Sequence, residues 1–335
     1  MKILKTAIVT LVAGLFLSCQ VEVQNDFQML RGAYMGQTPP GDEPEVFAPG
    51  IVSNGMNNRD VAIMPDGREM YFSVGFGNNT YSAVVFSKYE NGKWSDLEVA
   101  PFSTDSKYTY YEPFISADGS KIFFVTNQSI DEDTTRTDSN IWMAKRKGDQ
   151  WEKPQPLSSN INTENGEYFP SITKDGVLYY TGVDTEKRVN IILRSKWENG
   201  KFADPEILPD HVNIGRSRYN ATISPDESYL IIPVFGAEDS YGGTDYYISF
   251  RDENDNWSDP VNMGPKINSA DAHEWSAYVT SDEKYIFFMS ARTDKIAKPQ
   301  KLTYSYLKEI FPKPQNGNAD IYWMKADFIK SLNKE

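Results

Sequence analysis

Cysteine and histidine are nearly absent from this chain of 335 residues, which holds one cysteine and two histidines. A single cysteine excludes an internal disulfide framework and a Cys-based structural zinc site. His211 and His273 are too few for a His-rich metal site. The acidic stretch Asp131-Glu132-Asp133 with Asp138 lacks the glycine of an EF-hand loop, so we interpret it as a solvated loop. We therefore predict neither a bound metal nor a cofactor.

Basic residues and long apolar runs are also scarce. Lysine and arginine number 34 against 47 acidic residues, which gives a formal net charge of −13. This balance repels phosphate backbones and argues against nucleic-acid binding. The absence of a Gly-x-Ser-x-Gly motif disfavours a serine hydrolase domain. An apolar run from Ala7 to Leu17 is too short to span a bilayer.

Residues 1–18 have the pattern of a secretory leader, because two lysines precede the apolar run and Ser18-Cys19 follows it. Phe16-Leu17-Ser18-Cys19 resembles the bacterial lipoprotein processing box, with Phe16 where that box prefers Leu and Leu17 where it prefers a smaller residue. The resemblance implies a signal peptide over residues 1–18 and lipidation of Cys19. It also implies anchoring to a membrane of the bacterial cell envelope, facing the periplasm or the cell surface. The alternative is an ordinary signal peptide with an incidental cysteine.

An acidic turn between two β-rich segments recurs five times and organises the rest of the chain. One copy reads Ile172-Thr173-Lys174-Asp175-Gly176, and segments such as Lys121-Ile122-Phe123-Phe124-Val125 beside the turns favour strands. Apolar strand, Asp-Gly turn and aromatic strand predict a hairpin with a type I′ turn. Successive acidic residues lie 52, 57, 51 and 56 positions apart, a period near that of propellers and solenoids. They are Asp66, Asp118, Asp175, Asp226 and Asp282.

Each complete repeat contains four candidate strands, but the fifth repeat stops after its third, Asp320-Ile321-Tyr322-Trp323-Met324. The missing strand is at the other end of the chain, where Pro44-Glu45-Val46-Phe47-Ala48-Pro49 matches Pro205-Glu206-Ile207-Leu208-Pro209. An N-terminal strand that completes the last sheet closes a ring and leaves no long open edge. We predict an all-β monomer: a single closed β-propeller of five four-stranded blades over residues 45–335, after a tether over residues 19–44. Six blades are the alternative, if a degenerate blade lies within residues 20–58.

These repeats resemble the WD-like propeller repeat of the TolB family, in which a Ser-Pro-Asp-Gly turn joins two inner strands and an Asp-Ile-Tyr element opens the next. Ser224-Pro225-Asp226 and Asp320-Ile321-Tyr322 match these motifs, and Glu227 replaces the glycine. The resemblance covers about residues 46–325 and implies the propeller fold and a partner-binding role in the cell envelope. Because the motifs consist of hairpin and packing residues, they indicate the fold and carry no chemistry.

The first residues of the strand before each acidic turn are expected to ring one mouth of the central channel. Aromatic faces, carboxylates and guanidinium groups together suit the recognition of sugars or peptides, by stacking and bidentate hydrogen bonds. We therefore predict that the mouth binds a glycan or an envelope protein, with the long connection over residues 292–319 as a cover. The predicted binding residues are Arg59, Asp60, Tyr111, Glu112, Glu167, Tyr168, Arg218, Tyr219, His273, Glu274 and Trp275.

Two other interpretations of this ring stay open. Its aromatic side chains can pack between blades while its carboxylates cap backbone amides, which would make the ring structural. Alternatively, two carboxylates can act as acid and base on a glycosidic bond, as in propeller glycoside hydrolases. Glu112, Glu167 and Glu274 could supply such a pair, although their spacing selects none of the three. We favour a non-catalytic binding protein over a glycan-cleaving enzyme.

Overall fold

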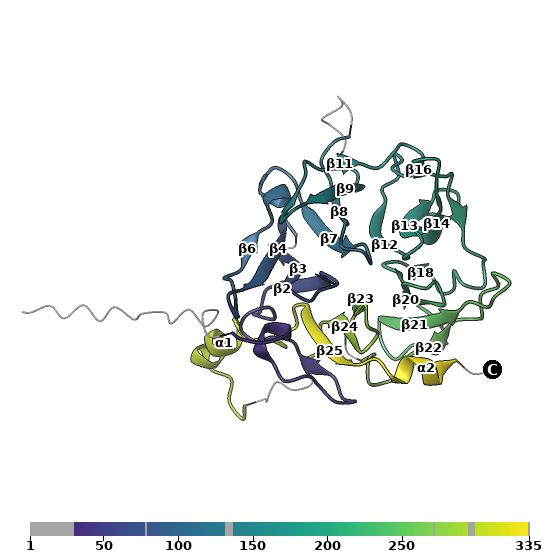
Figure 1. Ribbon diagram of the computed structural model, residues 1–335. Coiled ribbons are helices and arrows are strands. Elements are labelled where there is room, and N and C mark those ends of the chain that lie inside the picture. The colour runs from purple at the N-terminus through teal and green to yellow at the C-terminus, as the bar shows by residue number, and fades with distance from the viewer. Residues whose placement is uncertain (1–29, 78, 131–136, 271, 294–298, 334–335) are drawn as a thin grey trace, which may run out of the picture.

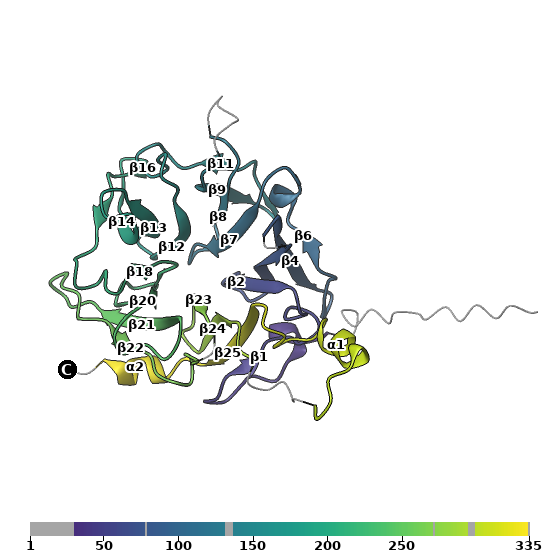
Figure 2. The ribbon, with the colours of Figure 1, turned by 180° about the vertical axis from the view of Figure 1, so that it is seen from behind.

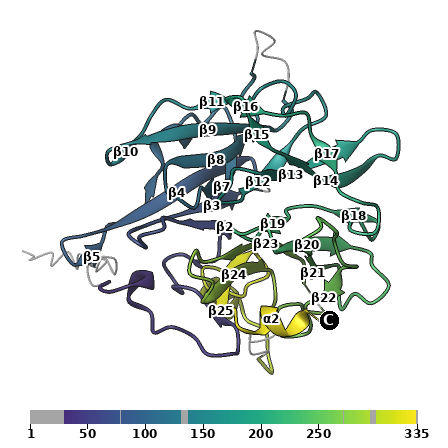
Figure 3. The ribbon, with the colours of Figure 1, turned by 45° about the vertical axis from the view of Figure 1, so that its right-hand side comes forward.

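The computed structural model describes residues 30–333, apart from residues 78, 131–136, 271 and 294–298. Five small antiparallel sheets stand around a common centre, one after another in chain order, as Figure 1 shows from one side and Figure 2 from behind. Figure 3 shows the same sheets after a turn of 45°. The architecture is the closed all-β propeller that the repeats predict, with five blades and not six. The leader and Cys19 lie outside the described residues.

Each blade has the same strand order from the centre outward. The innermost strands precede the acidic turns and are β2 (Asn57–Ile63), β7 (Tyr110–Ile115), β12 (Tyr168–Ile172), the pair β18 (Ser217–Arg218) and β19 (Thr222–Ile223), and β23 (Glu274–Val279). The second strands are β3 (Glu69–Phe76), β8 (Lys121–Thr126), β13 (Leu178–Asp184), β20 (Tyr229–Phe235) and β24 (Tyr285–Ser290). The third strands are β4 (Tyr81–Glu90), β9 (Asn140–Lys147), β14 (Val189–Ser195), β21 (Thr244–Phe250) and β25 (Asp320–Lys325).

Two-residue strands complete the blades on the outside. They are β6 (Glu98–Val99), β11 (Gln155–Pro156), β17 (Glu206–Ile207), β22 (Val261–Asn262) and β1 (Glu45–Val46). Other short strands at the outer turns are β5 (Lys93–Trp94), β10 (Gln150–Trp151), β15 (Trp197–Glu198) and β16 (Lys201–Phe202). The helical elements are η2 (Tyr34–Gly36), η3 (Pro101–Ser103), α1 (Tyr304–Ile310) and α2 (Phe328–Leu332). Among the described residues, no helix has the length and apolar character needed to cross a bilayer.

The N-terminal strand closes the ring, as the repeat count predicts. β1 pairs antiparallel with β25, with Glu45 opposite Trp323. The next residue, Phe47, is fully buried. Its ring meets those of Phe287 and Trp323 edge-on, at 5.1 and 5.2 Å between ring centres. The closure therefore combines a backbone ladder with an aromatic cluster.

The described part of the predicted tether packs against the propeller. Trp94 donates hydrogen bonds from its backbone nitrogen to the carbonyl of Leu30 at 3.1 Å and from its indole nitrogen to that of Gly32 at 2.9 Å. Met35 is 1% exposed, and the ring of Tyr34 lies 5.2 Å from that of Trp323. These contacts cover an apolar face between the first and last blades that would otherwise meet water. Residues from Leu30 onward thus pack with the fold, whereas the sequence predicts a tether through residue 44.

Apolar side chains fill the interfaces between neighbouring blades. Over the described residues they form five buried clusters, one at each interface. Aromatic residues of the outer turns pack on the second strand of the preceding blade. Trp151 Nε1 donates a hydrogen bond to Tyr71 Oη at 2.9 Å, and the Trp257 ring lies 6.2 Å from the Tyr179 ring. Neighbouring blades are thereby joined by core packing and by aromatic contacts.

The acidic turns differ from the predicted type I′ geometry. A type I′ turn has positive φ at both central residues, but here φ is positive only at the residue after the aspartate, from 54° to 87°. A backbone hydrogen bond from Gly67 N to Met64 O at 2.8 Å closes the first turn and leaves the left-handed residue at its end. The prediction of turn type was wrong because the aspartate acts through its side chain. The left-handed residues are Gly67, Gly119, Gly176, Glu227 and Glu283.

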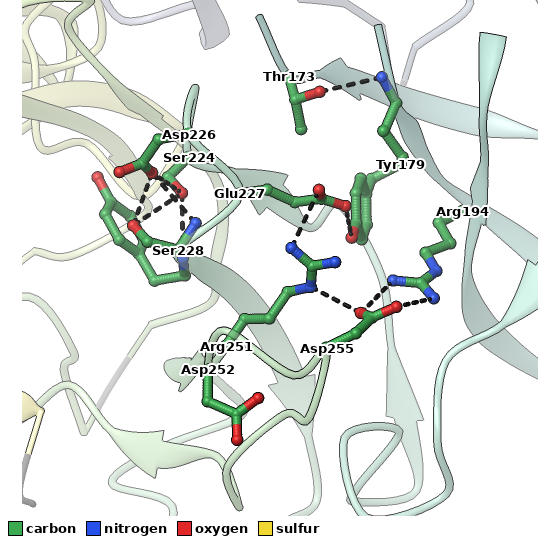
Figure 4. Close-up of polar contacts among 12 residues, drawn as sticks. Thr173, Tyr179, Arg194, Ser224, Asp226, Glu227, Ser228, Arg251, Asp252 and Asp255 are labelled. Atoms are coloured by element: carbon green, nitrogen blue, oxygen red, sulfur yellow. Dashed lines mark hydrogen bonds and ion pairs between the residues drawn. The ribbon is translucent and has the colours of Figure 1, made fainter. Parts of the chain in front are cut away.

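Glu227, which replaces the glycine of the TolB-family motif, links two blades (Figure 4). Its carboxylate accepts a hydrogen bond from Tyr179 Oη of the preceding blade at 2.7 Å and pairs with Arg251 at 3.2 Å. Arg251 also pairs with Asp255 at 2.7 Å. Two bonds of 2.7 and 2.8 Å then join Asp255 to Arg194 of the preceding blade. The departure from the motif therefore supplies a polar connection across the interface of the third and fourth blades.

Candidate functional site

One cavity lies where the innermost strands begin, and we call it the central cavity. Three consecutive residues near the start of each of these strands occupy equivalent positions in the five repeats, and we call each set a triplet. The triplets are Asn58-Arg59-Asp60, Tyr110-Tyr111-Glu112, Glu167-Tyr168-Phe169, Arg218-Tyr219-Asn220 and Glu274-Trp275-Ser276. The middle residue of every triplet lines this cavity. Because side chains alternate along a strand, equivalent positions of the five blades turn toward the same space. The cavity has a volume of about 580 Å³, within the range of small-ligand sites. Its middle-position residues are Arg59, Tyr111, Tyr168, Tyr219 and Trp275.

The third residue of each triplet has a left-handed backbone. None of the five is a glycine, their φ values run from 51° to 114°, and in four blades the pairing register with the second strand shifts nearby. Such bulges re-aim side chains and backbone groups, and they are common beside functional sites. One consequence is that Phe169 N donates a hydrogen bond to Glu112 Oε2 of the preceding blade at 2.8 Å. The five residues are Asp60, Glu112, Phe169, Asn220 and Ser276.

Arg59 joins two carboxyl groups at the wall of the cavity. Its Nε lies 3.1 Å from Asp60 Oδ2, and its Nη2 lies 3.4 Å from Glu112 Oε1. The guanidinium carbon lies 5.5 Å from the centre of the Tyr111 ring. Ser276 Oγ donates a hydrogen bond to the other oxygen of Asp60. The guanidinium is therefore held between two acids and an aromatic face, with its orientation set by all three.

Burial raises the pKa of Glu112 to about 8, against the attraction of the Arg59 guanidinium, and the negative charge of Asp60 also raises it. The carboxyl group of Glu112 consequently keeps its proton through most of the neutral range. The single guanidinium of this cluster therefore faces Asp60 and a Glu112 carboxyl group whose ionisation burial disfavours. Its chemistry suits a ligand that brings hydrogen-bonding groups rather than charge.

Neutral polar side chains complete the lining of the central cavity. Tyr219 Oη and Thr244 Oγ1 lie 2.6 Å apart, and burial raises the pKa of Tyr219, so its hydroxyl stays protonated. The sequence prediction did not identify the smaller lining residues, because Asn, Ser and Thr in turns and at strand ends form no distinguishing pattern. These residues are Asn79, Ser82, Thr109, Ser139, Asn190 and Asn220.

Glu167 and Glu274, at the first triplet position, do not line the cavity. Alternation along the strand turns this position away from the middle one. Glu167 accepts hydrogen bonds from the backbone nitrogen and the hydroxyl of Thr163, both at 2.6 Å. Glu274 is fully buried and accepts from the hydroxyls of Ser269 and Ser290 at 2.8 Å. The three carboxylates considered for an acid and base pair therefore do not meet in the central cavity.

Arg218 and His273 also lie away from the cavity lining. Arg218 is 7% exposed and donates to the carbonyls of Ile214 and Gly215 at 3.5 and 3.4 Å. His273 is exposed, with its ring 5.8 Å from that of Trp275. Asp60 is buried beside the cavity, where it orients the Arg59 side chain through their ion pair. The six predicted residues that the structure brings together on the cavity are Arg59, Tyr111, Glu112, Tyr168, Tyr219 and Trp275.

The described part of the connection over residues 292–319 does not line the central cavity. Its helix α1 lies at the outer edge of the ring in Figures 1 and 2. Asn316 and Asn318 donate hydrogen bonds to the carbonyl of Gly55 at 3.0 and 2.7 Å, which ties the connection to the segment before β2. Within the part of the chain that the structure describes, no group of three or more His, Cys, Asp or Glu side chains could hold a metal ion.

Comparison with solved structures found similarity to proteins of several kinds. TolB from Acinetobacter baumannii is 12% identical with a TM-score of 0.42, over 81% of this chain and 57% of the TolB chain. The native Bacillus subtilis arabinanase Arb43A is 13% identical with a TM-score of 0.49, over 82% of this chain and 96% of that one. The GH43 endo-arabinanase from Bacillus licheniformis is 13% identical with a TM-score of 0.48, over 80% and 93%.

No family model and no curated protein matches the chain. The three TM-scores lie below 0.5, so the five-bladed fold is assigned from the sheet topology of the chain itself.

Proposed function

We propose that this chain is an exported binding protein that takes a neutral glycan into the central cavity. The lining of that cavity carries the proposal: four aromatic side chains and one guanidinium group, contributed by five blades, surround about 580 Å³. Aromatic faces stack on sugar rings, and the amides and hydroxyls between them pair with sugar hydroxyls. A site of this kind recognises the shape and hydroxyl pattern of a ligand without needing its charge.

The balance of charge on the cavity wall supports a neutral ligand. Arg59 is already paired with Asp60, and Glu112 competes for the same guanidinium. An anionic ligand would have to displace these partners, which would leave a buried carboxylate without its cation. A neutral polyol adds hydrogen bonds and leaves the cluster intact.

Glycoside hydrolysis is a second candidate, which one observation favours. Glu112 lines the cavity and has a raised pKa, as a general acid requires. The reaction also needs a second carboxylate on the other side of the scissile bond. Asp60 is 5% exposed and is held by Arg59 and Ser276, which makes it a poor partner. We therefore rank binding above catalysis.

A glycan array with wild type and the variants Tyr168→Ala and Trp275→Ala tests the binding proposal. Loss of either aromatic face is expected to weaken binding about fivefold or more, because one aromatic contact is worth ~1 kcal/mol beyond its buried area. Trp197→Ala is the matched control, since Trp197 is an exposed aromatic residue outside the cavity lining. Equal binding by all four proteins, or no glycan bound at all, would reject the central cavity as a glycan site. Binding of peptides alone would point to a protein partner.

Glu112→Gln separates binding from hydrolysis. The amide keeps the shape of the carboxyl group but cannot transfer its proton, so a binder should keep its affinity within a few fold. A glycosidase should lose activity by roughly 10²–10⁴-fold. Release of reducing sugar by wild type, together with its loss in this variant, would overturn the non-catalytic proposal.

We also propose that the protein is exported and anchored through a lipid on Cys19. The support is the leader over residues 1–18 and the place of the sole cysteine directly after it. Cys19→Ala should move the protein from the membrane fraction to the soluble fraction and remove the mass of the acyl groups. Unchanged fractionation of the variant would argue for an incidental cysteine.

A further inference from the structure

The helix α1, in the long connection before β25, turns its apolar side chains toward solvent. Tyr304, Leu307 and Phe311 follow one another at intervals of three and four residues, so they form one stripe along the helix and its C-cap. Leu302 lies just before the helix, and the exposed fractions of these four side chains run from 43% to 75%. Among the described residues, no other large apolar side chain is as exposed as Tyr304, Phe311 or Leu302. An exposed apolar stripe of this kind points to contact with an apolar partner.

The other face of α1 and the segment after it hold the helix on the propeller. Tyr306 and Ile310, four residues apart, are half-buried, whereas the residues between them are exposed. Thr303 caps the helix by accepting a hydrogen bond from Tyr306 N at 3.2 Å. Asn316 Nδ2 donates to the carbonyl of Phe311 at 2.7 Å as well as to that of Gly55. The helix therefore keeps its shape and its place without a partner on the apolar stripe.

Lysines flank the apolar stripe, in a molecule that is acidic as a whole. Residues 299–313 hold Lys301, Lys308 and Lys313 against one acid, while the whole chain has a net charge of −13. That acid, Glu309, is paired with Lys313 at 2.7 Å. Lys308 Nζ lies 5.0 Å from the centre of the Tyr304 ring, directly beside the stripe. Because salt screens charges beyond about 10 Å, the lysines beside the stripe act on a surface that it touches more strongly than distant acids do.

We propose that α1 is an interfacial helix that inserts its apolar stripe into the surface of a bilayer with anionic headgroups. Aromatic and leucine side chains partition into the boundary between headgroups and acyl chains, and lysines beside them extend to the phosphates. A protein partner fits this surface less well, because lysine is depleted in protein–protein interfaces. The contact is with the bilayer surface, since α1 is too short to cross a membrane.

The proposed lipid on Cys19 would hold the same sector of the ring near the membrane. Leu30 packs on the apolar cluster between the first and last blades. The connection that carries α1 is tied to Gly55, just before β2 of the first blade. From Cys19 to Leu30 the chain spans at most about 40 Å even when fully extended. Two contacts with one bilayer would fix the direction in which the central cavity opens, and this orientation rests on the proposed anchor, whereas bilayer contact rests on α1 alone.

Sedimentation with lipid vesicles tests the helix separately from the lipid anchor. The chain from Gln20 onward contains the whole described propeller but lacks the leader and Cys19. It should bind vesicles of equal parts phosphatidylcholine and phosphatidylglycerol, and bind vesicles of phosphatidylcholine alone more weakly. Tyr304→Ser together with Phe311→Ser should weaken binding to the mixed vesicles by about tenfold or more, because two apolar side chains leave the interface.

Two further pairs of substitutions complete the experiment. Phe235→Ser with Tyr241→Ser removes an exposed phenylalanine and an exposed tyrosine of the fourth blade, and as the matched control it should leave vesicle binding unchanged. Lys301→Gln with Lys308→Gln should weaken binding to the mixed vesicles by on the order of tenfold and change binding to phosphatidylcholine little. All of these side chains are exposed, so every variant should keep the melting temperature of the parent chain.

Binding to neither kind of vesicle, or equal binding by the variant pair of α1 and the control pair, would overturn the interfacial helix. A dimer in sedimentation equilibrium without lipid, lost in the α1 pair while vesicle binding is unchanged, would instead assign the stripe to a second copy of this chain. Both results are distinguishable from failure of the proposals above. The fractionation and mass of Cys19→Ala report on the lipid, and the glycan array reports on the central cavity.

Discussion

Side-chain hydrogen bonds explain why aspartate recurs in the acidic turns. Asp118 Oδ1 accepts bonds from Ser116 Oγ at 2.6 Å and from Ser120 N at 2.9 Å. Asp226 accepts the same two kinds of bond, from residues two before and two after it. Although partial burial acts to raise the pKa of Asp118, these hydrogen bonds lower it to about 2. The aspartate therefore stabilises the turn as a charged acceptor, and the next residue supplies the left-handed backbone.

A comparison of two glycines in these turns distinguishes the cost of a left-handed backbone from the cost of steric contact with neighbouring side chains. Gly67 and Gly119 have similar φ values, +70° and +68°, but only Gly119 has close neighbours. An added Cβ would lie 3.0 Å from Met64 Cε and 3.3 Å from Pro65 Cδ, whereas at Gly67 nothing lies within 4 Å. Each Gly→Ala change should cost ~1 kcal/mol in unfolding free energy for the left-handed backbone, and Gly119→Ala should cost ~1 kcal/mol more. Urea unfolding of both variants measures the difference, and equal losses would contradict the contact argument.

Closure of the ring depends on one short element that is distant in sequence from its partner strand. β1 supplies only two paired residues, so much of the stability of its contact with β25 comes from the next side chain, Phe47. The segment before it adds the contacts of Leu30, Gly32 and Met35 with the first and last blades. An open last blade would expose the outer edge of β25, which is a template for association with other chains.

Phe47→Ala should destabilise the whole propeller. The side chain is fully buried between Phe287 and Trp323, and truncation of a buried phenylalanine typically costs ~3–5 kcal/mol. Glu45→Ala is the control, since Glu45 is exposed on the same strand and its backbone pairing is kept. Thermal and urea unfolding should show a large loss for Phe47→Ala and little change for Glu45→Ala. Similar stability of the two variants would show that the blade closes without this aromatic contact.

Buried carboxyl groups should make the whole molecule less stable as pH rises from about 5 to about 8. Burial raises the pKa of Glu112 to about 8, that of Glu274 to about 7 and that of Asp320 to about 6. The folded state therefore binds more protons than the unfolded chain between the ordinary carboxyl pKa, near 4.5 for glutamate, and these raised values. Stability should fall as pH rises through this window. The net charge of −13 at neutral pH acts in the same direction through self-repulsion.

We expect the melting temperature to be higher at pH 5 than at pH 8.5. Glu112→Gln should reduce this dependence by on the order of a few kcal/mol in unfolding free energy, because a neutral amide has no proton to lose. Glu98→Gln, at an exposed position of β6, serves as the control for the change in net charge. Melting curves across the pH range test the expectation. A profile that is the same in Glu112→Gln and in wild type would place the pH dependence elsewhere.

The repeat pattern by itself predicted five blades, with six as the alternative, and it determined the order of strands and the closure by residues near Glu45. These features follow from spacing along the chain: hairpin signals at a regular period define strands, and a strand missing at one end and found at the other defines the seam. The place of the middle triplet residues at the channel mouth could also be predicted, because they occupy equivalent positions in every repeat. Sequence could not give the turn type, since Asp-Gly is compatible with more than one backbone path.

Only the tertiary structure decided which side chains share the central cavity and what each carboxylate contacts. Bulges at the third triplet position bring Asp60, Glu112 and Asn220 to the wall, while alternation sends Glu167 and Glu274 to other partners. These contacts join residues that are far apart in sequence, and no local pattern encodes them. Their geometry is set by how neighbouring blades pack, which becomes defined only when the ring has closed.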